Sequence, residues 1–444
     1  MQTAGPMPVG KAQTSAAETP AVADDGIGVN LRPWSAFAYH DFTMLWLGGV
    51  TMMVAMQMRL FTSAQWIFEE TGSEVQLGLL GAVQFLQMPV VIYGGALADV
   101  VDRKKLMAMT QVVSFLSLLA LSVAAFSDTL AVWHIFVVQG VTGMVNMLGN
   151  SARPAMISRV VPRSHLTHAV TTNTATFQVA GIAAPIAFGV VFTVWGVGAA
   201  FAVTTAIAAI SVVTPFLIRV SGEPEGGSRK VSIQSLKEGF TFVRRHKVLP
   251  GLYLLDIGVT VVSFYRFLFP IFAASLYGMG AVGVGFLAAA NSVGGIFGST
   301  LVLYTAGMAR KGVLVLAATA IYAVLLIAFG SIHIFVIGLV IVAGLGATDA
   351  VGMVMRQTVV QLTTPDRLLG RASSAHSFAA MGANNAGQVE VAFMSGAVGA
   401  GPTMVLGGLV SIVVVVLIWR LVPGVRNYRY DPDAEREAAE HPES

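Results

Sequence analysis

Long apolar runs with almost no charged residues are the feature of this sequence that most restricts its fold. A run of about 20 such residues has the length and polarity of a helix that spans a bilayer. Only 11% of the 444 residues are charged, whereas soluble domains average about 25%. We therefore predict an all-α membrane protein with twelve transmembrane helices, at 42–67, 76–97, 106–126, 132–155, 165–192, 196–218, 249–277, 281–305, 312–330, 334–358, 369–397 and 401–422.

The polar stretches divide this array into two groups of six helices. Residues 221–248 open with a flexible run and continue as a segment whose apolar residues Ile233, Leu236, Phe240 and Val243 share one helical face. This pattern predicts an amphipathic helix at the membrane surface. The expected domains are a disordered cytoplasmic tail (1–33), an N-terminal six-helix half (34–220), this cytoplasmic linker (221–248), a C-terminal six-helix half (249–422) and a second cytoplasmic tail (423–444).

Positive charge gathers on one set of connections. The loops after the second, fourth, sixth, eighth and tenth segments carry Lys and Arg, whereas the alternate loops carry none. Because Lys and Arg are enriched in cytoplasmic loops, we expect both termini in the cytoplasm. The expected location is the plasma (cytoplasmic) membrane, which is the inner membrane of a cell with two.

The two groups of helices repeat each other. An offset of 207 residues relates Gly78–Gln84 to Gly285–Asn291. An offset of 203 relates three later residues of the first half (Asn146, Arg153, Pro162) to three of the second (Asp349, Arg356, Pro365). Two repeated six-helix halves are typical of transporters that bind their substrate between the halves.

Several catalytic classes are excluded by missing motifs. The chain contains no Cys, so it has no disulfides, thiolate metal sites or Cys nucleophiles. It also lacks a His-Glu-x-x-His zinc motif and a phosphate-binding Gly-x-x-x-x-Gly-Lys-Ser/Thr loop. We expect a protein that is not an enzyme, with no cofactor, no metal and no nucleic-acid partner.

The loop Gly95–Lys104 (GALADVVDRK) resembles the signature loop of the major facilitator superfamily. Three further stretches resemble its proton-linked exporters, the branch with enterobactin exporters and macrolide efflux pumps: Glu70–Ser73, Asn150–Pro154 with Val161-Pro162, and Pro365–Arg371. This resemblance implies alternating access of rocker-switch type, export coupled to proton entry, and a gate that uses Asp99 and Arg103.

Five charged residues lie at membrane depth, well inside the ends of the predicted spans: Arg59, Asp256, Arg266, Asp349 and Glu390. The offset of 207 places Arg59 on Arg266, so the two would face each other across a central cavity. Paired guanidinium forks favour an anion, and phosphate antiporters of the superfamily resemble this chain in carrying such a pair. Two alternatives remain open, namely structural pairing of each arginine with an acid and reach of Arg59 towards Glu69.

The three buried acids are the candidate proton carriers. Asp256, Asp349 and Glu390 all lie in the C-terminal half, and a desolvated carboxyl holds its proton more strongly. Asp349 could instead pair with Arg356 one and a half turns away, which leaves Glu390 as the expected partner of Arg266. Arg153 and Arg356, near the cytoplasmic ends of their helices, are expected to form gate salt bridges with nearby loops.

The expected function is secondary active transport by a protein working as a monomer. The first hypothesis is proton-coupled export of a small organic or inorganic anion bound by Arg59 and Arg266. The alternative is proton-driven efflux of a neutral or cationic hydrophobic compound, a drug or a siderophore, with both arginines in structural ion pairs.

Overall fold

The computed structural model describes residues 34–90, 101–223, 240–305 and 308–429. Both predicted tails beyond these limits, Asp99 and most of the predicted amphipathic linker lie outside the described residues. Of the predicted linker, residues 221–223 and 240–248 are described, and residues 240–245 are helical.

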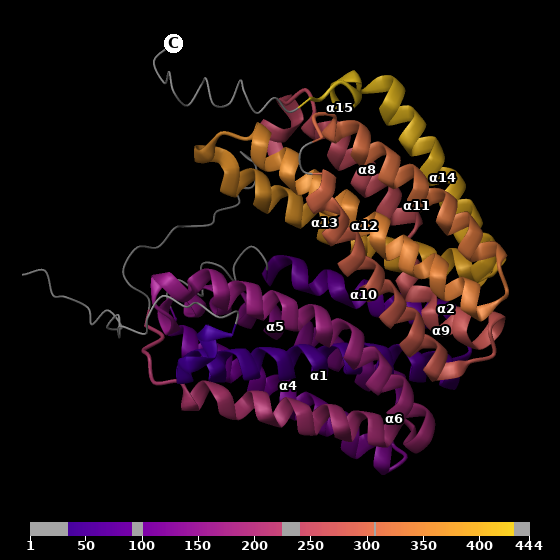
Figure 1. Ribbon diagram of the computed structural model, residues 1–444. Helices are drawn as coiled ribbons and strands as arrows, with labels where there is room; N and C mark the ends of the chain where they lie inside the picture. Colours follow the sequence, from indigo (N-terminus) through magenta and orange to yellow (C-terminus); the bar gives the residue numbers. More distant parts are fainter. Residues whose placement is uncertain (1–33, 91–100, 224–239, 306–307, 430–444) are drawn as a thin grey trace, which may run out of the picture.

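The described residues form helices joined by short turns (Figure 1). The helices of the first half are α1 (His40–Thr71), α2 (Glu74–Gln84), α4 (Arg103–Phe126), α5 (Val132–Val160) and α6 (Leu166–Leu217). Those of the second half are α8 (Leu249–Val262), α9 (Phe269–Ile271), α10 (Gly280–Thr305), α11 (Lys311–Ser331), α12 (Phe335–Thr363), α13 (Asp366–Val398), α14 (Ala400–Leu421) and the short α15 (Pro423–Arg426).

The twelve predicted spans correspond to these elements. Among the described residues, nine helical stretches are long and apolar enough to cross a membrane. One of them, α6, contains two of the predicted spans, which meet at Gly196 in a left-handed conformation (φ 79°) that glycine adopts without strain. The more polar α13 and the described part of the second span, α2, account for the remaining two. The expected all-α, twelve-helix membrane fold is thus confirmed.

The seventh span departs from the continuous helix predicted at 249–277. Helix α8 ends at Val262, and the chain continues as a 3-10 turn (Tyr265–Leu268), the short α9 and a π turn (Phe272–Leu276). Pro270 keeps the chain after the break from returning to a regular helix, because its ring would clash with the carbonyl of residue 266 there. The hydroxyl of Tyr322 donates to the freed carbonyl of Ser263 at 2.9 Å, as a broken helix in a membrane requires.

The two halves touch at one side of the molecule. We call the side on which α1 begins the near side and the opposite side the far side. Helix α2 packs on α13, and the first predicted span within α6 packs on α10. The contacting residues lie in the part of each helix that is nearest to the far side of the molecule. Figure 1 shows the halves diverging from there towards the near side.

Small residues allow this close approach at the far side. A Cβ atom at Gly285 would lie 2.6 Å from the carbonyl oxygen of Pro185, and one at Gly189 would lie 2.9 Å from that of Ala281. The side chains of Gln84 and Gln388 form a hydrogen bond across the same interface at 2.9 Å. The far side is therefore closed in this conformation.

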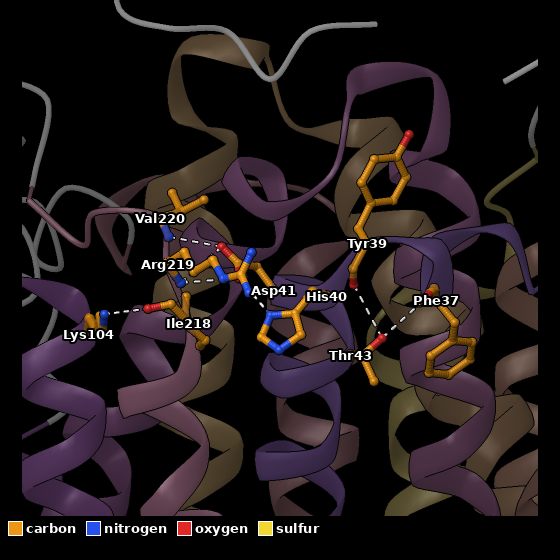
Figure 2. A network of polar contacts seen from close by, with 9 residues as sticks. All are labelled: Phe37, Tyr39, His40, Asp41, Thr43, Lys104, Ile218, Arg219 and Val220. Atoms are coloured by element: carbon orange, nitrogen blue, oxygen red, sulfur yellow. Dashed lines mark hydrogen bonds and ion pairs between the residues drawn. The ribbon is translucent and has the colours of Figure 1, made fainter. Parts of the chain in front are cut away.

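The N-terminal half is tied together at its near side (Figure 2). Asp41, at the start of α1, accepts hydrogen bonds from the backbone N–H groups of Arg219 and Val220, just after α6 ends. Lys104, in the first turn of α4, donates to the carbonyl of Ile218. These contacts connect the first, third and last helices of the half.

Asp102, in the loop before α4, caps that helix next to the chain that follows α6. Asp102 accepts from the backbone N–H groups of Lys104 and Lys105 at 2.9 and 3.2 Å, which caps α4. Gly222 packs against this cap, and its carbonyl accepts from the N–H of Arg103 at 2.9 Å. The side chain of Arg159 donates to the carbonyls of Ser221 and Glu223.

Candidate functional site: a cavity between the halves

A cavity of about 340 Å³ lies between the two halves, next to their far-side contact. Its walls come from α1, α2, α6, the broken seventh span, α10 and α13. Aromatic rings and neutral polar groups dominate the lining, and the only charged side chain among its lining residues is Arg266. The lining side chains with these properties are Phe61, Phe264, Phe267, Phe269, Gln57, Gln84, Gln388, Asn291 and Ser292.

Arg266 is paired with an acid at the edge of this cavity. Its Nη2 atom lies 3.7 Å from Oδ2 of Asp349 on α12, and the two side chains are 44% and 41% exposed. The guanidinium also lies 5.4 Å from the centre of the Phe264 ring, within the range of a cation–π contact. The partner of Arg266 is thus Asp349 rather than the expected Glu390.

A second ion pair lies behind the first. Arg356 of α12 binds Asp256 of α8 with 2.7 Å between Nη2 and Oδ1, and both side chains are only about a tenth exposed, at 12% and 11%. The alternative pairing of Asp349 with Arg356 is therefore not the one observed. Both pairs line a small cavity of about 50 Å³ inside the C-terminal half.

The two pairs are reciprocal because the helices run antiparallel. Both segments carry an acid and then a base: Asp256 and Arg266 in the seventh span, and Asp349 and Arg356 in α12. Spacings of ten and seven residues along these helices bring each acid to the base of the other. Ten residues of regular helix would span about 15 Å, so Asp256 and Arg266 are too far apart to pair along the seventh span.

Arg59 does not line the cavity in this conformation. Its side chain is 4% exposed and donates to the amide oxygen of Gln139 on α5. Glu69 accepts instead from Gln65, at 2.6 Å, so Arg59 is not directed towards it. Arg59 and Arg266 occupy equivalent places in their halves, but the structure does not bring them together.

The other predicted residues that the structure describes do not line this cavity. Glu390 is partly buried on α13, and its Oε2 atom has no hydrogen-bond partner. The guanidinium of Arg153 packs against Gly49 of α1. Arg103 is the first residue of α4, and Asp99 lies outside the described residues.

Sequence analysis missed the neutral amides of the cavity. Gln84 and Asn291 occupy corresponding positions of the internal repeat, and both line the cavity. That correspondence is the signal that could have identified them. Gln57 on α1 and Gln388 on α13 have no comparable polar partner in the repeat, and only the fold places them at the same cavity.

The family follows from a direct comparison with known sequences. The sequence profile of the Major Facilitator Superfamily matches residues 45–387. The chain belongs to this superfamily. Among curated proteins it is similar to the enterobactin exporter EntS of Escherichia coli K12, with 26% identity over 90% of this chain and 93% of the relative. The exporter of the same name from Shigella boydii is 25% identical over the same shares.

Solved structures of superfamily transporters share the fold. A bacterial homolog of the lysosomal transporter Spinster, in an inward-facing and unoccupied conformation, aligns over 89% of this chain and 99% of its own with a TM-score of 0.67 and 14% identity. A D-xylose-proton symporter aligns over 87% and 99% with a TM-score of 0.64 and 14% identity. The chain is a membrane transporter and not an enzyme, and its relatives support an efflux function.

Proposed function

We propose that this protein is a proton-coupled exporter that binds a hydrophobic organic compound in the cavity between its halves. The observation that carries the proposal is the Arg266–Asp349 pair, which lies at the edge of that cavity with both side chains more than a third exposed. A carboxylate in this place can accept a proton when the far side opens and release it on the near side. Alternating access makes this exchange directional.

The first consequence of protonation is the loss of the ion pair. A protonated Asp349 carries no charge, so Arg266 is released from α12 and the contact between the seventh span and α12 loosens. Glu390, with its unpartnered oxygen, is the second candidate carrier. Asp256 is less suited to this role, because its pair with Arg356 is short and little exposed.

The lining favours a neutral or cationic hydrophobic compound over an anion. Aromatic rings offer stacking surfaces, amide groups offer hydrogen bonds, and the one lining cation is already neutralised by Asp349. Sites of this kind are typical for organic ligands. The relatives named as enterobactin exporters agree with an organic substrate.

The second candidate function is export of an anion that is bound by Arg59 and Arg266. It is favoured by one observation: Arg59 forms no ion pair with any acid in the described part of the chain. A rearrangement that turned Arg59 from Gln139 to the cavity would bring the two guanidinium groups to one ligand.

The orientation of the chain completes the proposal. The placement of Lys and Arg supports cytoplasmic termini. With that orientation, the near side faces the cytoplasm and the described conformation opens towards it. We propose that Arg103, Arg153 and Arg356 contribute to the cytoplasmic gate, together with Asp99, which lies outside the described residues. We propose a monomer in the plasma membrane as the working unit.

Ligand-dependent thermal stabilisation of the purified chain tests the substrate class, since a ligand that binds the folded state raises the melting temperature. A panel of anions, neutral compounds and organic cations is compared at pH 6 and pH 8 on wild type, Arg59→Gln and Arg266→Gln. Stabilisation of wild type by neutral or cationic compounds, retained in Arg59→Gln, is expected. Stabilisation by anions alone, lost in both variants, would refute the proposal in favour of anion export.

Proton coupling is tested separately in proteoliposomes loaded with the stabilising compound. Asp349→Asn keeps the shape of the side chain but cannot carry a proton. We expect this variant to bind the compound yet to lose the acceleration of transport by a pH gradient. A variant that still responds to the gradient like wild type would exclude Asp349 as the carrier.

A further inference from the structure

The internal repeat extends to the side chains that hold the ion pairs. The offset of 203 residues relates Arg153 on α5 to Arg356 on α12, and the offset of 207 relates Gly49 on α1 to Asp256 on α8. The pair Arg356–Asp256 of the C-terminal half therefore has a counterpart in the N-terminal half, formed by Arg153 and Gly49.

The geometry of the counterpart is preserved, but its acid is missing. In the C-terminal half, the guanidinium of Arg356 reaches from α12 to the carboxylate of Asp256 on α8. In the N-terminal half, the guanidinium of Arg153 reaches from α5 to α1 and occupies the space beside Gly49. A Cβ atom at that glycine would lie 2.7 Å from Cζ of Arg153. The guanidinium of Arg153 thus lies at the position equivalent to that of the Asp256 carboxylate, but Gly49 supplies no carboxylate there.

No other acid of the described residues takes over this role. The ion pairs among them are His40–Asp41, Arg266–Asp349 and Arg356–Asp256. Asp41, the acid of α1 nearest to Gly49 in sequence, accepts from the backbone of Arg219 and Val220. An arginine that is only partly exposed to solvent gains from an anionic partner, because its charge is poorly solvated there.

Arg59, the other arginine of the repeat in the N-terminal half, also lacks the acid that its counterpart has. By the repeat, Arg59 corresponds to Arg266 and Asn146 to Asp349. The neutral Asn146 lies 3.4 Å from the hydroxyl of Ser114, while Arg59 bonds to Gln139. At the four equivalent positions, the C-terminal half thus has two bases and two acids, whereas the N-terminal half has two bases and no acid.

We propose that Arg153, beside Gly49, forms an anion site that takes a carboxylate or phosphate group in place of the missing side chain. The planar guanidinium fork matches both groups. Because Gly49 has no Cβ, the guanidinium lies directly against α1, where that residue offers it no side chain to pair with. Gly49 lies near the beginning of α1, so the site is on the near side, towards which the two halves diverge (Figure 1). It is separate from the substrate cavity, and it does not depend on which compound is exported.

A free anion and the headgroup of an anionic lipid offer the same chemistry, and the experiment separates them. The full chain is purified in a neutral detergent, and its melting temperature is measured at constant ionic strength with increasing inorganic phosphate or acetate. A parallel series uses mixed micelles with phosphatidylglycerol, and phosphatidylcholine serves as the uncharged control. Stabilisation by phosphate or acetate identifies a site for free anions, and stabilisation by phosphatidylglycerol alone identifies a lipid site.

Three variants decide whether Arg153 carries the effect. Arg153→Gln should weaken anion binding, so that the half-saturating anion concentration rises about tenfold or more, since a charge-assisted bidentate contact is lost. Gly49→Asp supplies the acid of the C-terminal half, so it should raise the melting temperature without anion and abolish the further response. Gly49→Asp combined with Arg153→Gln should lose that gain, because the new acid is then unpaired.

Two results would overturn the proposal. One is a wild-type chain that neither anions nor phosphatidylglycerol stabilise beyond the ionic-strength and phosphatidylcholine controls. The other is an unchanged response in Arg153→Gln. If Arg153→Gln does not fold, Arg153→Lys and Gly49→Asp suffice, because a response in Gly49→Asp equal to that of wild type also excludes the site.

Discussion

Gly285 on α10 controls how closely the two halves approach on the far side. An added Cβ would lie 2.6 Å from the carbonyl oxygen of Pro185, and ordinary contact begins at 3.4 Å. The shortfall of about 0.8 Å involves a backbone atom on each side, so no change of rotamer relieves it. Overpacking of this kind costs about 1–3 kcal/mol, and only the conformation with the far side closed is affected.

Gly285→Ala should therefore shift the population towards the conformation with the far side open. A cost of about 1–3 kcal/mol changes the equilibrium constant by roughly 5–150-fold. The matched control is Gly295→Ala on the same helix, where the nearest atom to a Cβ, the carbonyl oxygen of Gly346, is 3.9 Å away within the same half.

Spin labels on the far side measure this shift without background, because the chain has no cysteine of its own. Thr129→Cys, between α4 and α5, and Ser331→Cys, at the end of α11, are exposed positions on opposite halves. Pulsed electron–electron distances should be short in wild type and gain a longer component in Gly285→Ala only. Identical distributions for Gly285→Ala and Gly295→Ala would refute the reasoning that backbone contact at Gly285 limits far-side opening.

Three further predictions concern individual polar contacts. Asp256→Asn leaves Arg356 without its little-exposed partner, so thermal unfolding should show a loss of about 3–5 kcal/mol, clearly more than for Asp349→Asn, whose pair is over 40% exposed. Asp41→Ala removes the acceptor for two backbone N–H groups and should cost about 1–2 kcal/mol in the same assay, with exposed Glu70→Ala as the control; equal melting temperatures would contradict it. His246 accepts from the N–H groups of Val248 and Leu249 at the start of α8, and burial lowers its pKa below the ordinary 6.5. The neutral form of His246 is thus the one that stabilises the fold. This contribution is present above pH 6.5 and is lost as the pH falls through the lowered pKa. His246→Asn should remove that part of the pH dependence of the melting temperature, and an unchanged pH profile would count against this prediction.

The spans could be predicted from sequence because hydropathy depends on composition alone. The internal repeat also identified the arginines as equivalent, since residue spacing survives in both halves. The break of the seventh span was not predicted, although Pro270 was visible, because prolines in membrane helices often cause only a kink. Its consequence, the placement of Arg266 outside a regular helix, depends on the structure.

The ion pairs were predictable in kind but not in detail. Sequence analysis identified Asp256, Asp349 and Arg266 as charges within the spans and placed Arg356 near a helix end. It considered pairing along one helix, however, and gave Glu390 to Arg266. The observed pairs join antiparallel helices, and which residues meet depends on the depth and rotation of both. Likewise, the direction of Arg59 towards Gln139 depends on packing inside one half, which no spacing rule describes.

The contacts of Asp41 have a mechanical consequence for the N-terminal half. The carboxylate of Asp41 joins the start of α1 to the chain just after α6, so these two helices cannot slide past each other at the near side without breaking hydrogen bonds. The carbonyls of residues 221–223 also accept from Arg103 of α4 and Arg159 of α5. Rotation about the far-side contact therefore moves α1, α4, α5 and α6 together.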